Sequence, residues 1–292
     1  MHDYPATGFQ YLLGDRLKKV PAMFRHSTLA AVAAMLSFVP VTPASAQLMI
    51  APTRVVLTPS QRSMELVLVN KGEGTAAFRI AIENRRMAQD GSMEDAPDTR
   101  DGELFAADKI RATPRQLMIE PGGRQTLRVS ASDIGGLAPG EYRAHLRVMS
   151  APVAEATTAT PTESNDNSLS IQLIAVRSVT IPVLLRVGEL GATATIERAS
   201  YREQDKSILA VRLARSGTRS TYGDLVFTEE GAAEPAYRVR GIAVYVPNAE
   251  RDVLIPLPDD VRKRLAGRRV RIDYVSSEGD APGRIASQTV EL

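Results

Sequence analysis

The chain has 292 residues, a formal net charge of +2, no cysteine, no tryptophan and only three histidines. Its length suggests about two domains, and the missing cysteines exclude disulfide bonds. The first 46 residues carry the whole net charge, because their four basic residues outnumber their two acidic ones by two. The remainder is close to neutral, which argues against nucleic acid as a partner.

A secretory signal peptide is predicted at the N-terminus. Basic residues precede an apolar run at residues 29–41, and Ala44-Ser45-Ala46 supplies the small side chains of a leader-peptidase site. The run is shorter than the roughly 20 apolar residues of a membrane-spanning helix, so we expect no stable membrane insertion. The predicted signal covers residues 1–46 and the mature chain begins at Gln47. Met23 is an alternative start that would leave a signal of ordinary length.

The first half of the mature chain predicts a seven-stranded immunoglobulin-like sandwich. Short runs of alternating or β-branched residues are separated by turn residues such as Asn70-Lys71-Gly72. In one run Met64, Leu66 and Leu68 alternate with Glu65 and Val67, which predicts one buried face. The expected strands cover residues 49–57, 63–69, 76–83, 116–119, 125–129, 142–148 and 169–187.

Two segments of this half are expected to be loops. Residues 87–101 are rich in Asp, Gly and Met, and residues 151–167 are rich in Ala, Thr and Pro. The last expected strand, residues 169–187, is much longer than the usual length of about 5–6 residues. Such a length requires a partner or leaves an exposed edge.

A second sandwich is predicted after a glycine-containing linker. The domains are therefore residues 47–187 and 192–292, joined by residues 188–191, and the fold class is all-β with two tandem immunoglobulin-like sandwiches. Residues 259–265, acidic at the start and basic at the end, predict one short helix. The strands of this half are expected at residues 193–199, 208–213, 224–227, 237–246, 253–255, 269–274 and 285–290.

Catalytic chemistry has few residues to build on. His145 is the sole histidine after the predicted signal, and it lies in an alternating run. We therefore expect a strand residue with a satisfied hydrogen bond, because a general base needs a nucleophile or ligand set beside it. Carboxylate pairs such as Asp259-Asp260 suit helix caps and turns. We predict no enzyme, no metal site and no cofactor, and a hydrolase built on His145 is the weakest alternative.

Several stretches resemble the PapD-like periplasmic chaperones of pilus assembly. The most specific is residues 112–129, where a proline-containing strand and the turn Glu120-Pro121-Gly122-Gly123 precede a Gln-Thr-Leu-Arg-Val strand. The resemblance covers most of the first predicted domain and fades in the second. It is carried by residues 51–57, 66–70, 112–129, 140–146 and 181–186.

The resemblance implies a site for the C-terminal carboxylate of a client subunit. In that family a basic pair between the domains holds this carboxylate. Arg54 matches the first member of the pair. Its guanidinium can bind both oxygens of a carboxylate, which favours this role over the alternative that Arg54 is merely an exposed strand arginine. The second member, ordinarily a lysine, falls at Pro182. Arg177 and Arg186 are the nearby candidates to replace it.

The resemblance also implies that a strand is donated to the client. Alternate apolar side chains of residues 169–181 would fill the groove of an unfinished sandwich, while the backbone pairs with its open edge. The opposite face, with Ile174 and Val176, is the alternative donor face. The predicted client-binding residues are Leu169, Ile171, Leu173 and Ala175.

These features together predict a periplasmic chaperone. It would bind pilus or fibre subunits, deliver them to an outer-membrane usher and need neither cofactor nor nucleic acid. Whether the free protein covers its donor strand by self-association is left open. The main alternative is a structural or adhesive fibre or scaffold protein built of the same sandwiches. Genes for an usher-like outer-membrane protein and small secreted subunits beside this one would favour the chaperone.

Overall fold

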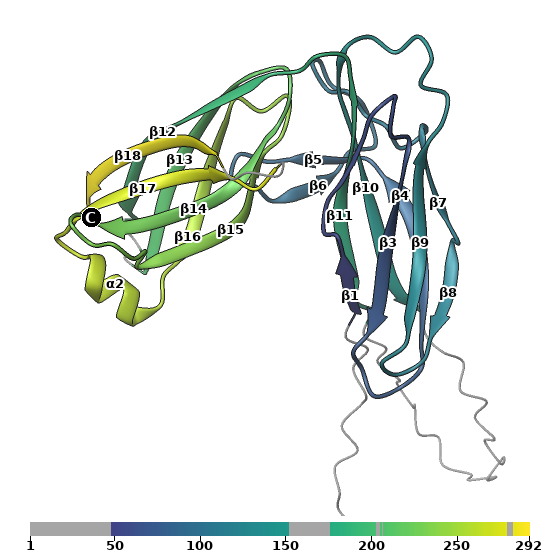
Figure 1. Ribbon diagram of the computed structural model, residues 1–292, viewed down its shortest axis with the longest axis horizontal. Helices are drawn as coiled ribbons and strands as arrows, with labels where there is room; N and C mark the ends of the chain where they lie inside the picture. The colour runs from purple at the N-terminus through teal and green to yellow at the C-terminus, as the bar shows by residue number, and fades with distance from the viewer. Residues whose placement is uncertain (1–47, 152–175, 203–204, 206, 279–282) are drawn as a thin grey trace, which may run out of the picture. The chain divides into compact units, whose positions relative to one another are not determined.

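The computed structural model describes residues 48–151, 176–202, 205, 207–278 and 283–292 (Figure 1). All of them belong to one compact unit, residues 44–292. The predicted signal peptide at residues 1–46 lies outside the described residues. Within the described part, no helix combines the length and the apolar composition that crossing a bilayer requires.

The first sandwich consists of two sheets with strand orders β1-β3-β9-β7 and β2-β11-β10-β4-β8. A two-stranded hairpin, β5-β6, is attached to it. The strands are β1 (Leu48–Ala51), β2 (Val55–Leu57), β3 (Ser63–Asn70), β4 (Ala76–Glu83), β5 (Arg85–Met87), β6 (Met93–Asp95), β7 (Ile110–Thr113), β8 (Gln116–Ile119), β9 (Arg124–Ala131), β10 (Gly140–Ala151) and β11 (Ser178–Val187).

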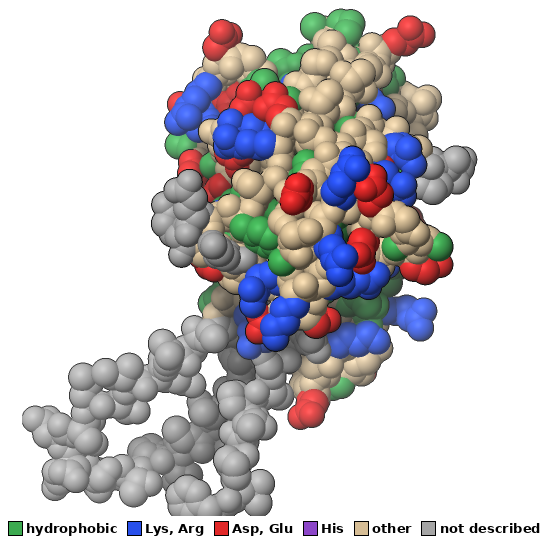
Figure 2. Space-filling view, turned by 90° about the vertical axis from the view of Figure 1, so that its left-hand side faces the viewer, with side chains coloured by type: hydrophobic (Ala, Val, Ile, Leu, Met, Phe, Trp, Pro, Cys, Tyr) green, Lys and Arg blue, Asp and Glu red, His purple; other side chains and the backbone are tan. Residues whose placement is uncertain are grey.

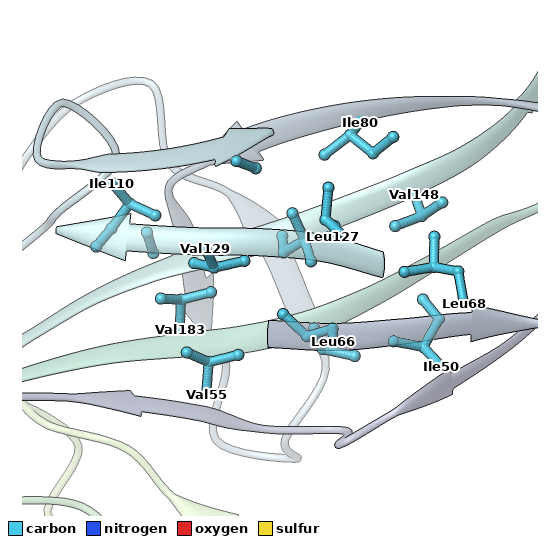
Figure 3. Close-up of a cluster of buried hydrophobic side chains, with 14 of the residues drawn as sticks. Ile50, Val55, Leu66, Leu68, Ile80, Ile110, Leu127, Val129, Val148 and Val183 are labelled. Atoms are coloured by element: carbon cyan, nitrogen blue, oxygen red, sulfur yellow. The ribbon is translucent and has the colours of Figure 1, made fainter. Parts of the chain in front are cut away.

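Apolar side chains from both sheets meet between them to form one core (Figure 3). Leu66 and Leu68 of β3 and Leu127 of β9 are fully buried there, opposite Val183 of β11. The face predicted from the alternation in residues 63–69 is thereby confirmed, because a strand turns successive side chains to opposite faces.

The second sandwich has the strand orders β12-β13-β16 and β15-β14-β17-β18 around a separate core that includes Phe227 and Tyr274. The helix α2 (Asp259–Leu265), at the predicted position, adds Val261 and Leu265 to this core. Basic and acidic side chains are interspersed on the face shown in Figure 2. The strands are β12 (Ala192–Tyr201), β13 (Ile208–Gly217), β14 (Thr221–Glu229), β15 (Tyr237–Val244), β16 (Glu250–Pro256), β17 (Arg269–Ser276) and β18 (Arg284–Glu291).

The all-β class and the two sandwiches are as predicted, whereas several boundaries were wrong. The expected strand at residues 49–57 is divided, because β1 pairs with β3 in one sheet and β2 pairs with β11 in the other. Pro52, between them, has no backbone N–H to continue a ladder. The expected final strand of the first half begins only at Ser178 in the described residues. The domain boundaries at residues 187 and 192 stay predictions.

The segment at residues 87–101 is not wholly a loop, as was expected. Met87 ends β5, and β6 follows after a short turn. This hairpin contacts the second sandwich, since Asn248 Nδ2 donates to the Met87 carbonyl at 3.0 Å and the Asp252 N–H donates to the Gln89 carbonyl at 2.8 Å. The hairpin is therefore part of the junction between the two sandwiches.

Candidate functional site

One edge of β11 is open over the first half of the strand. Its other edge pairs with β10 along its whole length, from Ser178 to Val187. On the open side β2 covers only Val183, Leu184 and Leu185. No described strand pairs with this side between Ser178 and Pro182. Backbone groups on an uncovered edge can add a strand from another chain.

The first core opens to the surface beside this edge. Val179 is 37% exposed although it lies on the same strand face as the core residue Ile181. Phe78 and Val148 are core residues that border the opening. An apolar side chain from a partner could therefore extend the core here. The opening is a pocket of about 370 Å³ lined by Leu48, Phe78, Val148, Ser150, Arg177, Ser178 and Val179.

Three arginines converge on the carboxylate of Glu278. Its oxygens lie 3.0 Å from Arg54 Nη2, 3.0 Å from Arg186 Nη2 and 2.7 Å from Arg219 Nη1. Burial would raise the pKa of Glu278, but the hydrogen bond from Arg186 and the charges of the arginines together lower it. Arg54 and Arg186 come from the first sandwich and Glu278 from the second, so this cluster joins the sandwiches.

Glu141, near the start of β10, is a second carboxylate at this junction. Its side chain is 1% exposed and accepts a hydrogen bond from Arg186 Nε at 2.9 Å. It also accepts hydrogen bonds from the backbone N–H of Ser220, at 3.1 Å, and from the Ser220 hydroxyl. Burial would lower the pKa of Arg186, but the hydrogen bonds and charges of Glu278 and Glu141 raise it. Arg186 is thus already bound to two carboxylates of the chain.

Arg54, in contrast, has unused hydrogen-bonding capacity. Its guanidinium carbon lies 4.4 Å from the ring centre of Tyr222 and 5.7 Å from that of Tyr245. Nη2 is close enough to Glu278 for an ion pair but not in hydrogen-bond geometry, so Nε, Nη1 and Nη2 have no acceptor among the described residues. A guanidinium fork with free donors is suited to a bidentate carboxylate.

The alternative for Arg54, that it is merely an exposed strand arginine, does not hold. Its side chain is only 8% exposed, and it lies between β1 and β2 rather than within a strand. The rings of Tyr222 and Tyr245 from the second sandwich cover it. The sequence could not show that the two tyrosines cover Arg54, because both are distant from it in the chain.

His145 is buried in the same junction, 3% exposed, with its ring edge-on to Tyr245 at 6.3 Å between centroids. Burial, and then the charges of Arg143 and Arg85, lower its pKa to about 3. The expected hydrogen bond is missing at Nδ1, which has no partner among the described residues. A neutral imidazole without a carboxylate partner is not the base of a triad.

We expect His145 to make stability depend on pH below its usual pKa. The pKa is about 3 in the folded chain and near 6.5 when unfolded, so only the unfolded chain takes up this proton and stability falls as the pH falls through that window. The loss due to His145 should reach about 2–3 kcal/mol near pH 4.5. The facing groups Arg143 and Tyr245 do not change charge between pH 7.5 and 4.5. Denaturant unfolding of wild type and His145→Gln at about pH 7.5 and 4.5 measures it, and an equal decrease in both would contradict it.

The predicted site residues have different outcomes. Arg54 and Arg186 are brought together at Glu278, whereas Arg177 contacts Ser150. Pro182 stands opposite His145 in the β10–β11 pairing. The donor residues Leu169, Ile171, Leu173 and Ala175, with Ile174, lie outside the described residues, while Val176 is exposed and outside any strand.

Sequence reasoning missed Glu278, Arg219 and Glu141. Glu278 and Arg219 lie in segments between strands of the second sandwich, and no motif distinguishes them from other surface charges. One feature of the sequence could have pointed to Glu141, because it belongs to residues 140–146, which carry part of the family resemblance.

No protein-family model and no curated protein sequence matches the chain. Solved structures of chaperone-usher periplasmic chaperones match most of it, and at their sequence identities the likeness concerns the fold. The CsuC–CsuE chaperone–tip adhesion subunit complex of Acinetobacter baumannii matches with 15% identity and a TM-score of 0.46, covering 82% of this chain and 97% of that chain. The E. coli chaperone DraB has 15% identity and a TM-score of 0.42, with coverages of 85% and 97%. The CupB2 chaperone of Pseudomonas aeruginosa has 13% identity and a TM-score of 0.44, with coverages of 84% and 100%.

Proposed function

We propose that this protein is a periplasmic chaperone that binds pilus or fibre subunits by adding a strand to their incomplete sheets. The observation that carries the proposal is the open edge of β11 between Ser178 and Pro182, beside the exposed Val179. A subunit that lacks one strand exposes an unpaired ladder edge and an apolar groove. Pairing with β11 satisfies both defects at once and prevents aggregation of the subunit.

The donated strand would continue β11 toward its N-terminal side. In a continuous strand, the odd-numbered residues before Val179 share its face. Leu169, Ile171, Leu173 and Ala175 are therefore the proposed donor residues, as the family resemblance implies. Each fully buried leucine or isoleucine side chain contributes about 1.5–3 kcal/mol, so a few of them supply most of the affinity.

Arg54 is the proposed anchor for the C-terminal carboxylate of the subunit. It has free donors, whereas Arg186 is already bound to Glu141 and Glu278. The anchor would fix the register of the added strand, because one end of that strand is then held at a defined point. Export by the predicted signal and delivery to an outer-membrane usher complete the proposal.

The test replaces Val179 and uses Val67 as a matched control. Val179→Asp should reduce subunit capture at least about tenfold, because a carboxylate in a dry apolar groove costs several kcal/mol. Val67 on β3 is 39% exposed, against 37% for Val179, but lies away from the open edge, so Val67→Asp should bind normally. Capture is measured by periplasmic co-expression with the secreted subunits encoded beside the gene, followed by quantitative mass spectrometry of the purified complex.

Thermal unfolding of each variant separates binding from folding. The nearly isosteric Val179→Thr should keep the fold and show a smaller loss of capture. Equal losses of subunit capture in Val179→Asp and Val67→Asp would show that the open edge of β11 is not the binding surface. Incorporation of the protein itself into fibres, rather than recovery of soluble complexes, would support the structural or adhesive alternative.

A further inference from the structure

Arg177, directly before β11, is held in register with the sheet although it lies outside the strand. The Ser150 N–H donates to the Arg177 carbonyl at 2.8 Å, and the Arg177 N–H donates to Ser150 Oγ at 2.9 Å. This pair continues the β10–β11 ladder beyond the pairing of Met149 with Ser178. The sheet therefore defines the position of the Arg177 backbone.

The side chain of Arg177 lies at the end of an apolar row. Arg177 and Val179 are two residues apart on paired, extended backbone, so their side chains share one face. Ile181 continues this face and is buried in the core. Arg177 is exposed and lines the opening of the core together with Phe78 and Val148. A cation thus stands where the row of apolar side chains reaches the surface.

This cation is remote from the arginine cluster at Glu278. Arg186, which belongs to that cluster, lies nine residues further along the same strand. At about 3.3 Å per residue, the two backbone positions are about 30 Å apart. Arg177 and Arg54 therefore cannot hold the same carboxylate.

The end of the sheet beside the open edge carries an excess of positive charge. None of the ion pairs in the described part of the chain includes Arg177 or the exposed Arg79 of β4. Arg147 of β10 has only a shared partner, because Glu83 lies 3.6 Å from Arg147 and 3.1 Å from Arg85. A subunit that approaches this end meets a basic surface.

Addition of a subunit strand would change the surroundings of Arg177. In the free chain its guanidinium is in contact with water. A strand paired with residues 178–182 would cover the apolar row and enclose Arg177 at the seam between the core of this sandwich and the groove of the subunit. Removing a charge from water is costly unless an opposite charge pairs with it. A carboxylate at the seam would supply that charge and accept charge-assisted hydrogen bonds.

We propose that Arg177 is a specificity-determining residue that selects subunits with an acidic side chain at this seam. The inference rests on the proposed chaperone function and adds the chemistry of the partner to it. Rejection contributes as much as attraction, because a subunit with a neutral or basic residue there would enclose an unpaired cation. The group recognised belongs to the groove wall, so amidation of the subunit's C-terminus should not affect this contact.

The test reverses the charge of Arg177 and measures capture of a secreted subunit that wild type binds in periplasmic co-expression. Arg177→Glu should reduce capture at least about tenfold, because like charges then face each other at the seam. Arg177→Met keeps the length of the side chain without its charge and should lose less. Each Asp and Glu of the subunit is then replaced by Lys. At one position this replacement should restore capture by Arg177→Glu and reduce capture by wild type.

Arg79→Glu provides the matched control. Arg79 is an exposed arginine of the same sheet, but β10 separates its strand β4 from β11. The change of charge is the same, so Arg79→Glu should capture the subunit as wild type does. Thermal unfolding accompanies each variant, and replacement of an exposed side chain should change stability little. A marked loss of stability in Arg177→Met without subunit would place the partner of this charge within the chain itself and overturn the proposal.

The remaining outcomes separate this inference from the proposed function. Normal capture by Arg177→Glu, with capture lost in Val179→Asp, would overturn this inference alone and show that the guanidinium stays in water beyond its apolar stem. Equal losses in Arg177→Glu and Arg79→Glu, or no subunit position at which Lys restores capture, would also overturn it. If wild type captured no subunit, the proposed function and this inference would fail together.

Discussion

Replacing Glu141 by Ala should lower the free energy of unfolding by about 2–4 kcal/mol, because it removes a buried carboxylate that accepts three hydrogen bonds and leaves Arg186 with Glu278 as its remaining carboxylate partner. The carboxylate is 1% exposed and bonds Arg186 at 2.9 Å. It also accepts both hydrogen bonds from Ser220, whose N–H and hydroxyl would lose this acceptor. Equilibrium unfolding in denaturant at neutral pH measures the loss.

A matched exposed carboxylate provides the control for this prediction. Asp259 is paired with Arg262 at 3.0 Å, but its side chain is 78% exposed. Asp259→Ala should therefore cost less than about 1 kcal/mol. If Glu141→Ala cost no more than this control, the junction would be held by the apolar contacts of Met87, Leu184 and Tyr245 instead. Glu141→Gln, which keeps an acceptor but loses the charge, should fall between the two.

Local alternation was sufficient to predict most of the strands that form the two cores. Residues 63–69 predicted β3 and its buried face, because a strand beside a single core repeats its pattern every two residues. The helix at Asp259–Leu265 was predicted from the acidic residues at its start and the basic residues at its end. These elements carry their signal within a few residues.

The β5–β6 hairpin could not be predicted in this way. Its strands are short and include Arg85, Arg86 and Glu94, so the sequence has the polarity of a loop. What stabilises it is tertiary, since Met87 packs with Leu184 and Tyr245 in a small cluster that draws on both sandwiches. Strands that are stabilised by contacts with residues distant in the sequence show no periodic pattern of their own.

The candidate site, too, was predicted only in part. Arg54 was predicted from the family resemblance, and Arg186 was a candidate for the second basic residue of the carboxylate anchor. Their convergence on Glu278 depends on how the two sandwiches pack, which no spacing in one half of the chain contains. The same packing buries Arg54 beneath Tyr222 and Tyr245. Replacing Arg54 should therefore affect the stability of the fold as well as subunit binding.

Amidating the C-terminus of a captured subunit should weaken its binding to the wild-type protein by roughly ten- to a hundredfold, since hydrogen bonds to charged groups contribute about 1.5–3 kcal/mol each. Arg54→Ala should cause a similar loss for the free C-terminus. The two changes should not add, because they remove the two halves of one interaction. Affinities of the four combinations, measured by titration calorimetry, test this.

Arg54→Ala should also lower stability, because the side chain is buried between two tyrosine rings and pairs with Glu278. An exposed strand arginine would have had little such effect. Arg54→Lys therefore accompanies it, since lysine keeps the charge toward Glu278 and loses only the bidentate fork. Arg219→Ala is the control, because Arg219 pairs with the same carboxylate at 2.7 Å but is one-third exposed.

The pattern of losses decides which residue holds the carboxylate. Loss of amidation sensitivity in Arg54→Lys, with sensitivity retained in Arg219→Ala, would identify Arg54 as the anchor. Additive losses would show that the carboxylate of the subunit binds at another site. If amidation had no effect on wild type, Glu278 would be the permanent partner of Arg54. Subunit binding would in that case rest on the strand added to β11, because no other charged contact would distinguish a free chain end.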